Sequence, residues 1–369
     1  MLLAESQSFE QSLKPELTRE LRRLVRPMNC YYSNLIEGHH TFPVEIDQAM
    51  VGDFSNEPLK RDRQLEAVAH IEVQNLIERE HPGPLVSEAF IKWVHREFCD
   101  RLPEDMLLVS NPLTGDRAVV QPGEFRTQGV KVGGHIAPEV SELPILLSRF
   151  VAAYGSSFHA LQQIIACAAA HHRLVWIHPF LDGNGRVSRL FTDAMLAEAG
   201  LGKGLWCVSR GFARTNDRYR SALAAADQTR QGDFDGRGNL TEQGLEEFCD
   251  YFLDTCLDQV KFMRKLFDPV ELAARVKVWC IEQHEQGHLE GGHWPLLREV
   301  LATGFIPRGL AGEIVGVGPR QGRNYLRTLC ERKLLVSDTP YGNVRLGFPT
   351  DVLDRWLPNF YPSDALKVG

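Results

Sequence analysis

One run of twelve residues constrains this chain more than any other feature of its sequence. Positions 178–189 read HPFLDGNGRVSR, and apolar residues recur at helical spacing from inside this run onward, at Val187, Leu190, Phe191, Ala194 and Met195. The pattern predicts a glycine-flanked turn that opens a helix. A helix start leaves backbone N–H groups unpaired and carries partial positive charge, so it attracts anions.

The side chains of this run suit chemistry on a phosphate group. Gly183 and Gly185 lack a Cβ and let the backbone approach a phosphate closely. Arg186 and Arg189 can each bind phosphate oxygens or a carboxylate through two N–H groups. Asp182 offers the hard oxygen ligand that Mg²⁺ prefers beside phosphates.

His178 opens the run, and its imidazole can accept a proton near neutral pH. The alternative interpretation is a plain Gly/Asn turn between two core helices, with His178 as an ordinary histidine at a helix end. One short turn rarely collects a base, a metal ligand and two arginines by accident. The run therefore favours transfer of part of a nucleotide.

The run resembles the signature of the Fic family, H-x-F-x-[D/E]-[G/A]-N-[G/K]-R-x-x-R, at every fixed position. The resemblance implies transfer of AMP from ATP to a Tyr, Thr or Ser hydroxyl of a target protein. His178 would be the base and Asp182 the Mg²⁺ ligand. A glycine at position 185 favours AMP transfer over the phosphorylation carried out by some relatives with lysine there. The implied ATP contacts are Asp182, Gly183, Asn184, Gly185, Arg186 and Arg189.

Two other segments resemble the same family. Residues 126–138, RTQGVKVGGHIAP, resemble the flap hairpin over the active site, which implies nucleotide contacts from Val132, Gly133, Gly134 and His135. An open strand edge on such a flap can hold a target segment as an added strand. The alternative is a hairpin that only covers the site.

The segment 217–223, DRYRSAL, resembles the helix whose tyrosines line the base and ribose pocket. The family often has two adjacent tyrosines there, whereas this chain has Tyr219 followed by Arg220. Asp227 corresponds to a position that contacts the base. The resemblance therefore implies that Tyr219 and Asp227 help to bind ATP.

A third match lies near the N-terminus. Residues 33–38, SNLIEG, fit the family's inhibitory motif [S/T]-x-x-x-E-[G/N]. Ser33 and Glu37 are four apart and share one face of a helix. Glu37 can pair with Arg189, which would occupy the arginine meant for the γ-phosphate and make bound ATP nonproductive. The alternative is an ordinary surface glutamate.

The sequence predicts a mostly α fold, namely a Fic-type helical bundle with a β-hairpin flap and a C-terminal winged-helix domain. We expect an N-terminal helical region over 1–100 with the inhibitory helix at about 29–40. The catalytic core would span 101–268, with a hairpin at roughly 117–134. Residues 269–369 would form the winged helix, because a helix, a turn, a helix and a β-ribbon follow in that order.

The C-terminal region leaves two partner classes open. Its second helix is basic through Arg320, Arg323, Arg327, Arg332 and Lys333. Such a helix can read a DNA groove, but winged helices also dock proteins, and docking is the interpretation we favour. The net charge of −7 argues against nucleic-acid binding through bulk charge. Nearby His284, His288 and His293 indicate solvated histidines rather than a metal site.

Several features favour a cytoplasmic protein. The eight cysteines include no C-x-x-C pair and indicate reduced, mostly buried thiols. The first residues lack the basic start and apolar core of a signal peptide. The most apolar stretch, 164–177, is broken by polar residues and is too short to span a membrane, so no membrane partner is expected.

The sequence thus predicts a cytoplasmic protein adenylyltransferase that uses ATP and Mg²⁺ and is inhibited by its own Glu37. Its partner would be a protein with a hydroxyl side chain, and self-modification or a homodimer is compatible with the sequence. One alternative is an enzyme that removes AMP from a modified protein. Another is a DNA-binding regulator whose Fic-like core senses nucleotide.

Overall fold

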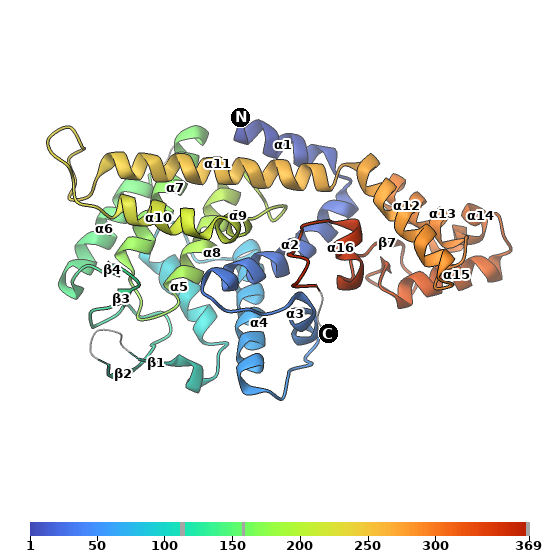
Figure 1. Ribbon diagram of the computed structural model, residues 1–369, viewed down its shortest axis with the longest axis horizontal. Coiled ribbons are helices and arrows are strands. Elements are labelled where there is room, and N and C mark those ends of the chain that lie inside the picture. The colour runs from blue at the N-terminus through green and yellow to red at the C-terminus, as the bar shows by residue number, and fades with distance from the viewer. Residues whose placement is uncertain (111–114, 157–158, 367–369) are drawn as a thin grey trace.

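The long helix α11 (Glu242–Leu266) runs along one side of the molecule and joins its larger helical part to the region that carries α12–α15 (Figure 1). The structure, a computed structural model, describes residues 1–110, 115–156 and 159–366. Most of the described residues are helical, as the sequence predicts. The helices before α11 are α1 (Leu2–Ser12), α2 (Pro15–Ile36), α3 (Pro43–Met50), α4 (Pro58–Arg79), α5 (Glu88–Cys99), α6 (Leu143–Tyr154), α7 (Ala160–Ile177), α8 (Asn184–Glu198), α9 (Val208–Arg214) and α10 (Asn216–Ala226).

Prolines begin several of these helices, because a proline at the first helical position gives up no hydrogen bond. Pro15, Pro43 and Pro58 begin α2, α3 and α4. Pro27 lies inside α2, and the helix runs through it without a break. The missing hydrogen bond is tolerated because nearly every residue from Leu24 to Ile36 packs into the core.

The inhibitory motif occupies the C-terminal end of α2 and not a separate helix over 29–40. The helix ends at Ile36, Glu37 is its C-cap, and Gly38 follows with a φ of 83°. A glycine in this left-handed conformation commonly ends a helix. Glu37 is thereby held at the end of a rigid, mostly buried element.

The strands differ from the single hairpin predicted at 117–134. Strand β1 (Leu108–Ser110) pairs with β2 (Arg117–Val119), and β3 (Lys131–Val132) pairs with β4 (His135–Ile136). Both sheets are antiparallel. The segment between β2 and β3 pairs with neither strand because it is fixed elsewhere: the N–H of Gly123 donates to Nδ1 of His95 on α5. The second hairpin lies within the segment that resembles a flap.

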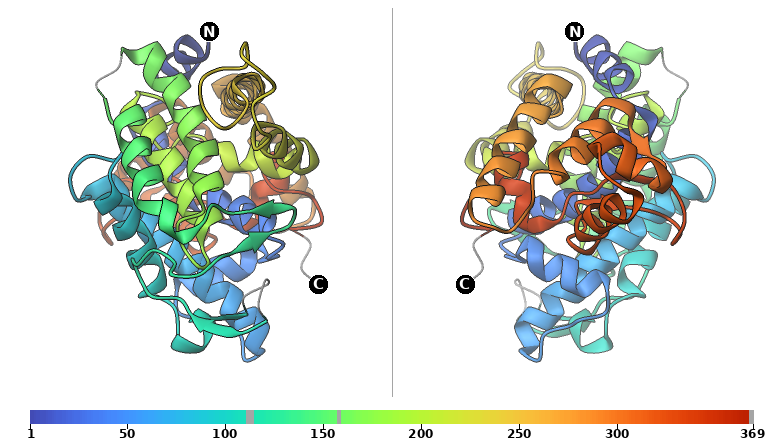
Figure 2. Two further views of the ribbon diagram at one scale, coloured as in Figure 1. Left: turned by 90° about the vertical axis from the view of Figure 1, so that its left-hand side faces the viewer. Right: turned by 90° about the vertical axis from the view of Figure 1, so that its right-hand side faces the viewer.

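Helix α8 lies at the centre of the larger part and packs against α2, α4, α5 and α7. Phe191 on α8 contacts the rings of Phe90 on α5 and Phe150 on α6. The left view of Figure 2 looks onto the end of the molecule that carries α6, α7 and the small sheets. The turn before α8 opens toward this end, so the signature residues lie between the core and the flap.

The C-terminal region contains the remaining elements. They are α12 (Pro269–Glu285), α13 (His293–Thr303), β5 (Phe305–Ile306), α14 (Ala311–Val315), α15 (Pro319–Glu331), β6 (Leu335–Val336), β7 (Val344–Leu346) and α16 (Leu353–Trp356). Its strands form an antiparallel sheet in the order β5-β7-β6. The winged-helix assignment and the boundaries 1–100, 101–268 and 269–369 stay predictions. Residues 111–114, 157–158 and 367–369 of those ranges lie outside the described residues.

The end of the chain returns to helix α2. The Tyr32 hydroxyl donates to the Phe360 carbonyl over 2.9 Å, and Arg345 on β7 forms a buried ion pair with Glu20. Short 3₁₀ turns complete the described structure at Glu104–Leu107, Val140–Glu142, Arg308–Leu310 and Thr350–Val352. The C-terminal region is therefore attached to the helix that ends in the inhibitory motif.

One predicted solvated histidine is buried instead. His293 begins α13, is 3% exposed and packs edge-on against Tyr325. Within the described ranges, no group of three or more His, Cys, Asp or Glu side chains could hold a metal ion. Seven of the eight cysteines are buried, as the sequence predicts. In the same ranges, no helix is both long enough and apolar enough to cross a membrane.

Candidate active site

The signature turn is closed by its own asparagine. Asn184 accepts a hydrogen bond from the Phe180 N–H and donates one to the Phe180 carbonyl, both at 2.8 Å. Gly183 adopts a φ of 78° as the N-cap of α8, a conformation that glycine allows without strain. The N–H groups of the first turn of α8 then point out of the helix end, where they can meet an anion.

His178 ends helix α7 in a left-handed conformation, with a φ of 49°. Its Nδ1 lies 3.3 Å from the Val175 carbonyl. A carbonyl can only accept, so Nδ1 carries the proton and Nε2 is the free acceptor. Burial, helped by the nearby charge of His135, lowers the pKa of His178 to about 4. The imidazole is therefore neutral at pH 7, as a general base must be.

Arg126 holds the turn and the flap together. Its side chain donates to the carbonyls of His178, at 2.8 Å, Gln128 and Pro138, and its backbone N–H donates to Pro179. Three carbonyls around one planar guanidinium fix its orientation in a way that a lysine could not. The position of His178 thus depends on a residue at the base of the flap.

His95 supports the turn from below. Its Nδ1 accepts from the Gly123 N–H at 2.9 Å, so its Nε2 carries the proton and donates to the Asp182 carbonyl at 3.3 Å. Its ring also stacks on Phe180, with centroids 3.8 Å apart and planes within 2°. Phe180 is fully buried, so its ring fixes the loop against the core.

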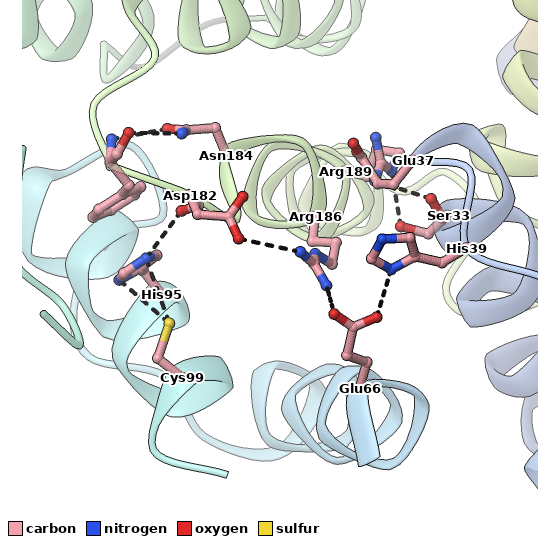
Figure 3. Close-up of polar contacts among 11 residues, drawn as sticks. Ser33, Glu37, His39, Glu66, His95, Cys99, Asp182, Asn184, Arg186 and Arg189 are labelled. Atoms are coloured by element: carbon pink, nitrogen blue, oxygen red, sulfur yellow. Dashed lines mark hydrogen bonds and ion pairs between the residues drawn. The ribbon is translucent and has the colours of Figure 1, made fainter. Parts of the chain in front are cut away.

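Arg189 is buried and bound by Ser33 and Glu37 of the segment 33–38. Its Nε donates to Oγ of Ser33 at 2.8 Å, and its Nη2 donates to the Ser33 carbonyl and to Oε1 of Glu37, the latter at 2.7 Å (Figure 3). Burial alone would raise the pKa of Glu37, but the charges of Arg189 and Arg186 outweigh it and lower the pKa. Glu37 is therefore an anion that occupies Arg189.

The same carboxylate lies directly over the signature glycine. A Cβ built on Gly185 would come within 2.1 Å of Oε1 of Glu37 and 3.0 Å of Nη1 of Arg189. Real Cβ contacts are longer than this. Any larger residue at position 185 must displace the Glu37 side chain, so the contact between Glu37 and Arg189 requires the glycine.

Arg186 is held by a second carboxylate that sequence reasoning did not find. Its Nη1 donates to Oε1 of Glu66 on α4 at 2.7 Å, and the other Glu66 oxygen pairs with His39 at 2.7 Å (Figure 3). Burial would raise the pKa of Glu66, but Arg186 and His39 lower it to about 2. The hydrogen bond to Glu66 raises the pKa of His39. Both signature arginines are thus bound to glutamates.

Asp182 is the signature acid that remains accessible. Its side chain is 52% exposed and lies 3.7 Å from Nη2 of Arg186. An accessible carboxylate of this kind can be a ligand for Mg²⁺, which takes most of its other ligands from phosphates and water.

The flap is anchored by its predicted nucleotide residue. His135 on β4 donates from Nε2 to the Trp176 carbonyl at 2.9 Å, and its Nδ1 lies 3.2 Å from Asp227. Asp227 also pairs with His172, and these two histidines lower its pKa to about 2 against the effect of burial. His135 and Asp227 therefore fasten the flap. Val132 is half exposed, and Gly133 turns the hairpin with a φ of 57° beside Gly134.

Tyr219 lies behind Arg189 and not in an open pocket. Its ring is 4% exposed and stacks on Phe212, with centroids 4.3 Å apart. Its hydroxyl lies 2.9 Å from Nε2 of His171. The resemblance implied that this tyrosine lines the base and ribose pocket. In the structure, packing in the core encloses its ring. The position of Tyr219 suits a residue that supports Arg189 from behind.

Residues 85–196 match the family model described as the Fic/DOC family. The chain contains a Fic domain. It is 36% identical over 128 residues to a protein adenylyltransferase Fic of Drosophila willistoni and 38% identical over 126 residues to one of Culex quinquefasciatus. These matches cover 33% of this chain and 25% of each relative, so the chain spans about a quarter of the length of the curated relatives it matches.

Solved structures share the fold of this chain. A Fic family protein from Desulfovibrio desulfuricans G20 has a TM-score of 0.52 at 19% identity and covers 94% of this chain and 95% of its own. A Fic domain containing signaling protein from Bacteroides thetaiotaomicron VPI-5482 has a TM-score of 0.55 at 20% identity, covering 72% of this chain and 94% of its own.

Residues outside the signature run support it. Glu66, His95 and Arg126 contact signature residues or their backbone, and His39 pairs with Glu66. Glu66 lies 120 positions before Arg186 and His95 lies 87 before Asp182. The one available signal was a charged or polar residue on the apolar face of a predicted helix, which Glu66 and His95 both are.

Proposed function

We propose that the chain is a protein adenylyltransferase that moves AMP from ATP to a Tyr, Thr or Ser hydroxyl of a target protein. The observation that carries the proposal is the free, neutral Nε2 of His178 beside the anion-attracting first turn of α8. The names of the curated relatives, which match over the Fic domain, support it.

In this mechanism, His178 accepts the hydroxyl proton at Nε2 while the hydroxyl oxygen bonds to the α-phosphorus of ATP. The bond between that phosphorus and the departing pyrophosphate breaks, and the target keeps the AMP. General-base help of this kind is worth roughly 10²–10⁴-fold in rate. Arg126 and His95 act as positioning residues, because they hold the backbone of the turn and not the substrate.

The remaining signature residues would stabilise the phosphates. The N–H groups of Gly183, Asn184 and Gly185 would surround the phosphates, and Arg186 and Arg189 would neutralise charge on the outer ones. Asp182 would hold Mg²⁺, which supplies neutralisation of the charge that builds on the leaving pyrophosphate. In this structure each of these two arginines forms an ion pair with a glutamate, at the group that would otherwise bind a phosphate.

We further propose that Glu37 is an inhibitor of this reaction. It occupies Nη2 of Arg189 and the space over Gly185, so a γ-phosphate cannot use both without displacing it. Couplings of this kind are typically ~1–3 kcal/mol, or roughly 5–150-fold. Activity would require Glu37 to leave, by motion of the α2 end or of its side chain.

The flap hairpin supports a way to hold the target. Val132 on β3 and Ile136 on β4 are more than half exposed, and the two strands pair only with each other among the described residues. Either outer edge can accept an extended target segment as a third strand. The Arg126 and His135 anchors would then set that segment beside His178.

A second candidate is removal of AMP from a modified protein. Glu37 favours it, because an anionic carboxylate that is about a third exposed can hold an attacking water beside the turn. In that reaction Glu37 is required, whereas in AMP transfer it is inhibitory. A DNA-binding regulator that senses nucleotide and a cytoplasmic location stay predictions, as do self-modification and a homodimer.

The test is incorporation of AMP from ATP labelled in the α-phosphate, with Mg²⁺, into purified protein and into a protein extract. We expect little incorporation with the wild-type chain, strong incorporation with Glu37→Gly and none with Glu37→Gly/His178→Ala. Release of AMP from an adenylylated partner by wild type and not by Glu37→Gly would replace the proposal with the second candidate.

A further inference from the structure

A cavity lies beside helix α8, beyond the signature residues. It has a volume of about 470 Å³ and is lined by helices α2, α4 and α8 and by the loops after α4 and α8. Cavities of this size hold small molecules. The residues that matter for its chemistry are Arg22, Ile77, Glu78, Asp193, Ala194 and Trp206.

Asp193 is an acid on the wall of this cavity that forms no ion pair within the described residues. Its Oδ2 accepts a hydrogen bond of 2.6 Å from the Asn29 side chain, and no Lys, Arg or His in the described ranges forms an ion pair with it. Of the two other acids on the wall, Glu78 is paired with Arg26, and Glu198 is exposed to solvent. Burial raises the pKa of Asp193 to about 7. A buried acid without a counter-ion is expensive unless a partner supplies one.

The rest of the wall is mainly apolar. Ile77, Leu190, Ala194 and Trp206 line it, and the Trp206 N–H is directed to Ser6 at 3.4 Å. Arg22 and Lys203 also stand on the cavity wall. Nε of Arg22 donates to the Lys203 carbonyl, and Nζ of Lys203 pairs with Glu10. The cavity therefore sets an acid without an ion pair against a largely apolar wall, which suits a cation on a small apolar body.

We propose that this cavity binds a small organic amine, whose ammonium group pairs with Asp193 and whose apolar body fills the space between α4 and α8. An ammonium group donates the charge-assisted hydrogen bonds that Asp193 lacks. The site is separate from the proposed ATP site, because it is lined by the C-terminal half of α8 and not by the signature turn.

The amine site is joined to the inhibitory contact by two successive connections between α2 and α8. Asn29 on α2 bonds to Asp193 on α8. One helical turn nearer the signature turn, Ser33 on α2 bonds to Arg189 on α8. An amine that takes over Asp193 competes with Asn29 and loosens this pairing. It should therefore favour the state in which Glu37 has left Arg189, a consequence for activity that rests on the proposed function.

Calorimetric titration of the full chain with tryptamine and phenethylamine tests the site without any activity assay. We expect both to bind and the neutral analogue 3-ethylindole to bind at least about tenfold more weakly. Asp193→Asn keeps the size of the side chain and should weaken tryptamine by about tenfold or more. Glu198→Gln, an acid also on the cavity wall, is the matched control and should change nothing. Ala194→Phe, which fills the cavity, should abolish binding.

Coupling is tested by the same titration on Glu37→Gly. Coupling between two sites that bias one equilibrium is reciprocal. Loss of the inhibitory contact should therefore tighten the binding of tryptamine by a few-fold. Unchanged affinity would remove the coupling. No binding of either amine to the wild type, or equal binding to Asp193→Asn, would overturn the site itself. Neither result bears on AMP transfer, which the labelled-ATP assay tests separately.

Discussion

Glu37 and Arg189 lie 152 positions apart in the chain, yet Oε1 of the glutamate accepts a 2.7 Å hydrogen bond from Nη2 of the arginine. The same oxygen fills the space where a side chain on Gly185 would begin. One carboxylate thus covers two signature positions at once. Because α2 and α8 are both buried, this contact is held by the core and not by a mobile segment.

Glu37→Gly should raise the rate of AMP transfer roughly 5–150-fold, which corresponds to removal of a coupling of typical size. The measurement is incorporation of label from ATP under identical conditions. Glu80→Gly is the matched control, since Glu80 is an exposed C-cap glutamate at the end of α4. Equal rates for wild type and Glu37→Gly would show that the contact does not inhibit.

Gly185→Ala should break the same contact from the other side. The new Cβ meets the end of a flexible side chain, so the fold should survive while Glu37 is pushed off Arg189. Urea unfolding of Gly185→Ala, Glu37→Gln and the double variant should show a non-additive free energy of about 0.5–3 kcal/mol. Gly309→Ala, with open space around its Cβ, is the control. Strict additivity would mean that the two positions do not share one contact.

The pH dependence of AMP transfer should show that His178 stays neutral at pH values far below the usual histidine pKa. Burial lowers the pKa of His178 to about 4. The base acts only when neutral, so the rate of Glu37→Gly should change little from pH 7.5 to 5.5 and should fall only nearer pH 4. A half-maximal rate near pH 6.5, the ordinary histidine value, would contradict the buried position of His178.

His70 should destabilise the protein in acid. Neither of its ring nitrogens has a hydrogen-bond partner among the described residues, and burial lowers its pKa to about 3. Above pH 6.5 both folded and unfolded chains are neutral at this site. Below it only the unfolded chain takes up the proton, so stability falls as the pH drops from 6.5 toward 3.

His70→Leu removes this titration and should flatten the pH dependence of the thermal midpoint. It also removes two unsatisfied polar atoms, each of which costs about 1–3 kcal/mol when buried, so stability at pH 7 should not fall. His288→Leu, at an exposed position, is the control. A pH profile unchanged from the wild type would exclude His70 as a source of acid sensitivity.

The sequence predicted the parts of the site that lie in short segments. The signature run, the inhibitory motif and the flap turn are each local, and residues close in sequence share a face or a turn by simple geometry. Asn184 and Phe180 belong to the same run, and their mutual hydrogen bonds need no distant partner. The helical fold class followed from periodicity in the same way.

Contacts between distant segments could not be read in advance. Glu66 meets Arg186 only because α4 packs beside α8, and Arg126 reaches His178 only after the chain between them has folded. The hairpin at 117–134 was predicted wrongly because alternation indicates a strand but not its partner. Tyr219 was expected at a nucleotide, whereas packing against Phe212 enclosed it.

The most direct measurement is a crystal structure of Glu37→Gly with Mg²⁺ and an ATP analogue that cannot be cleaved. The account predicts a single triphosphate at the first turn of α8, bound by Arg186 and Arg189, with metal on Asp182 and Nε2 of His178 facing the α-phosphorus. An empty cleft, or a nucleotide bound away from these four side chains, would contradict it.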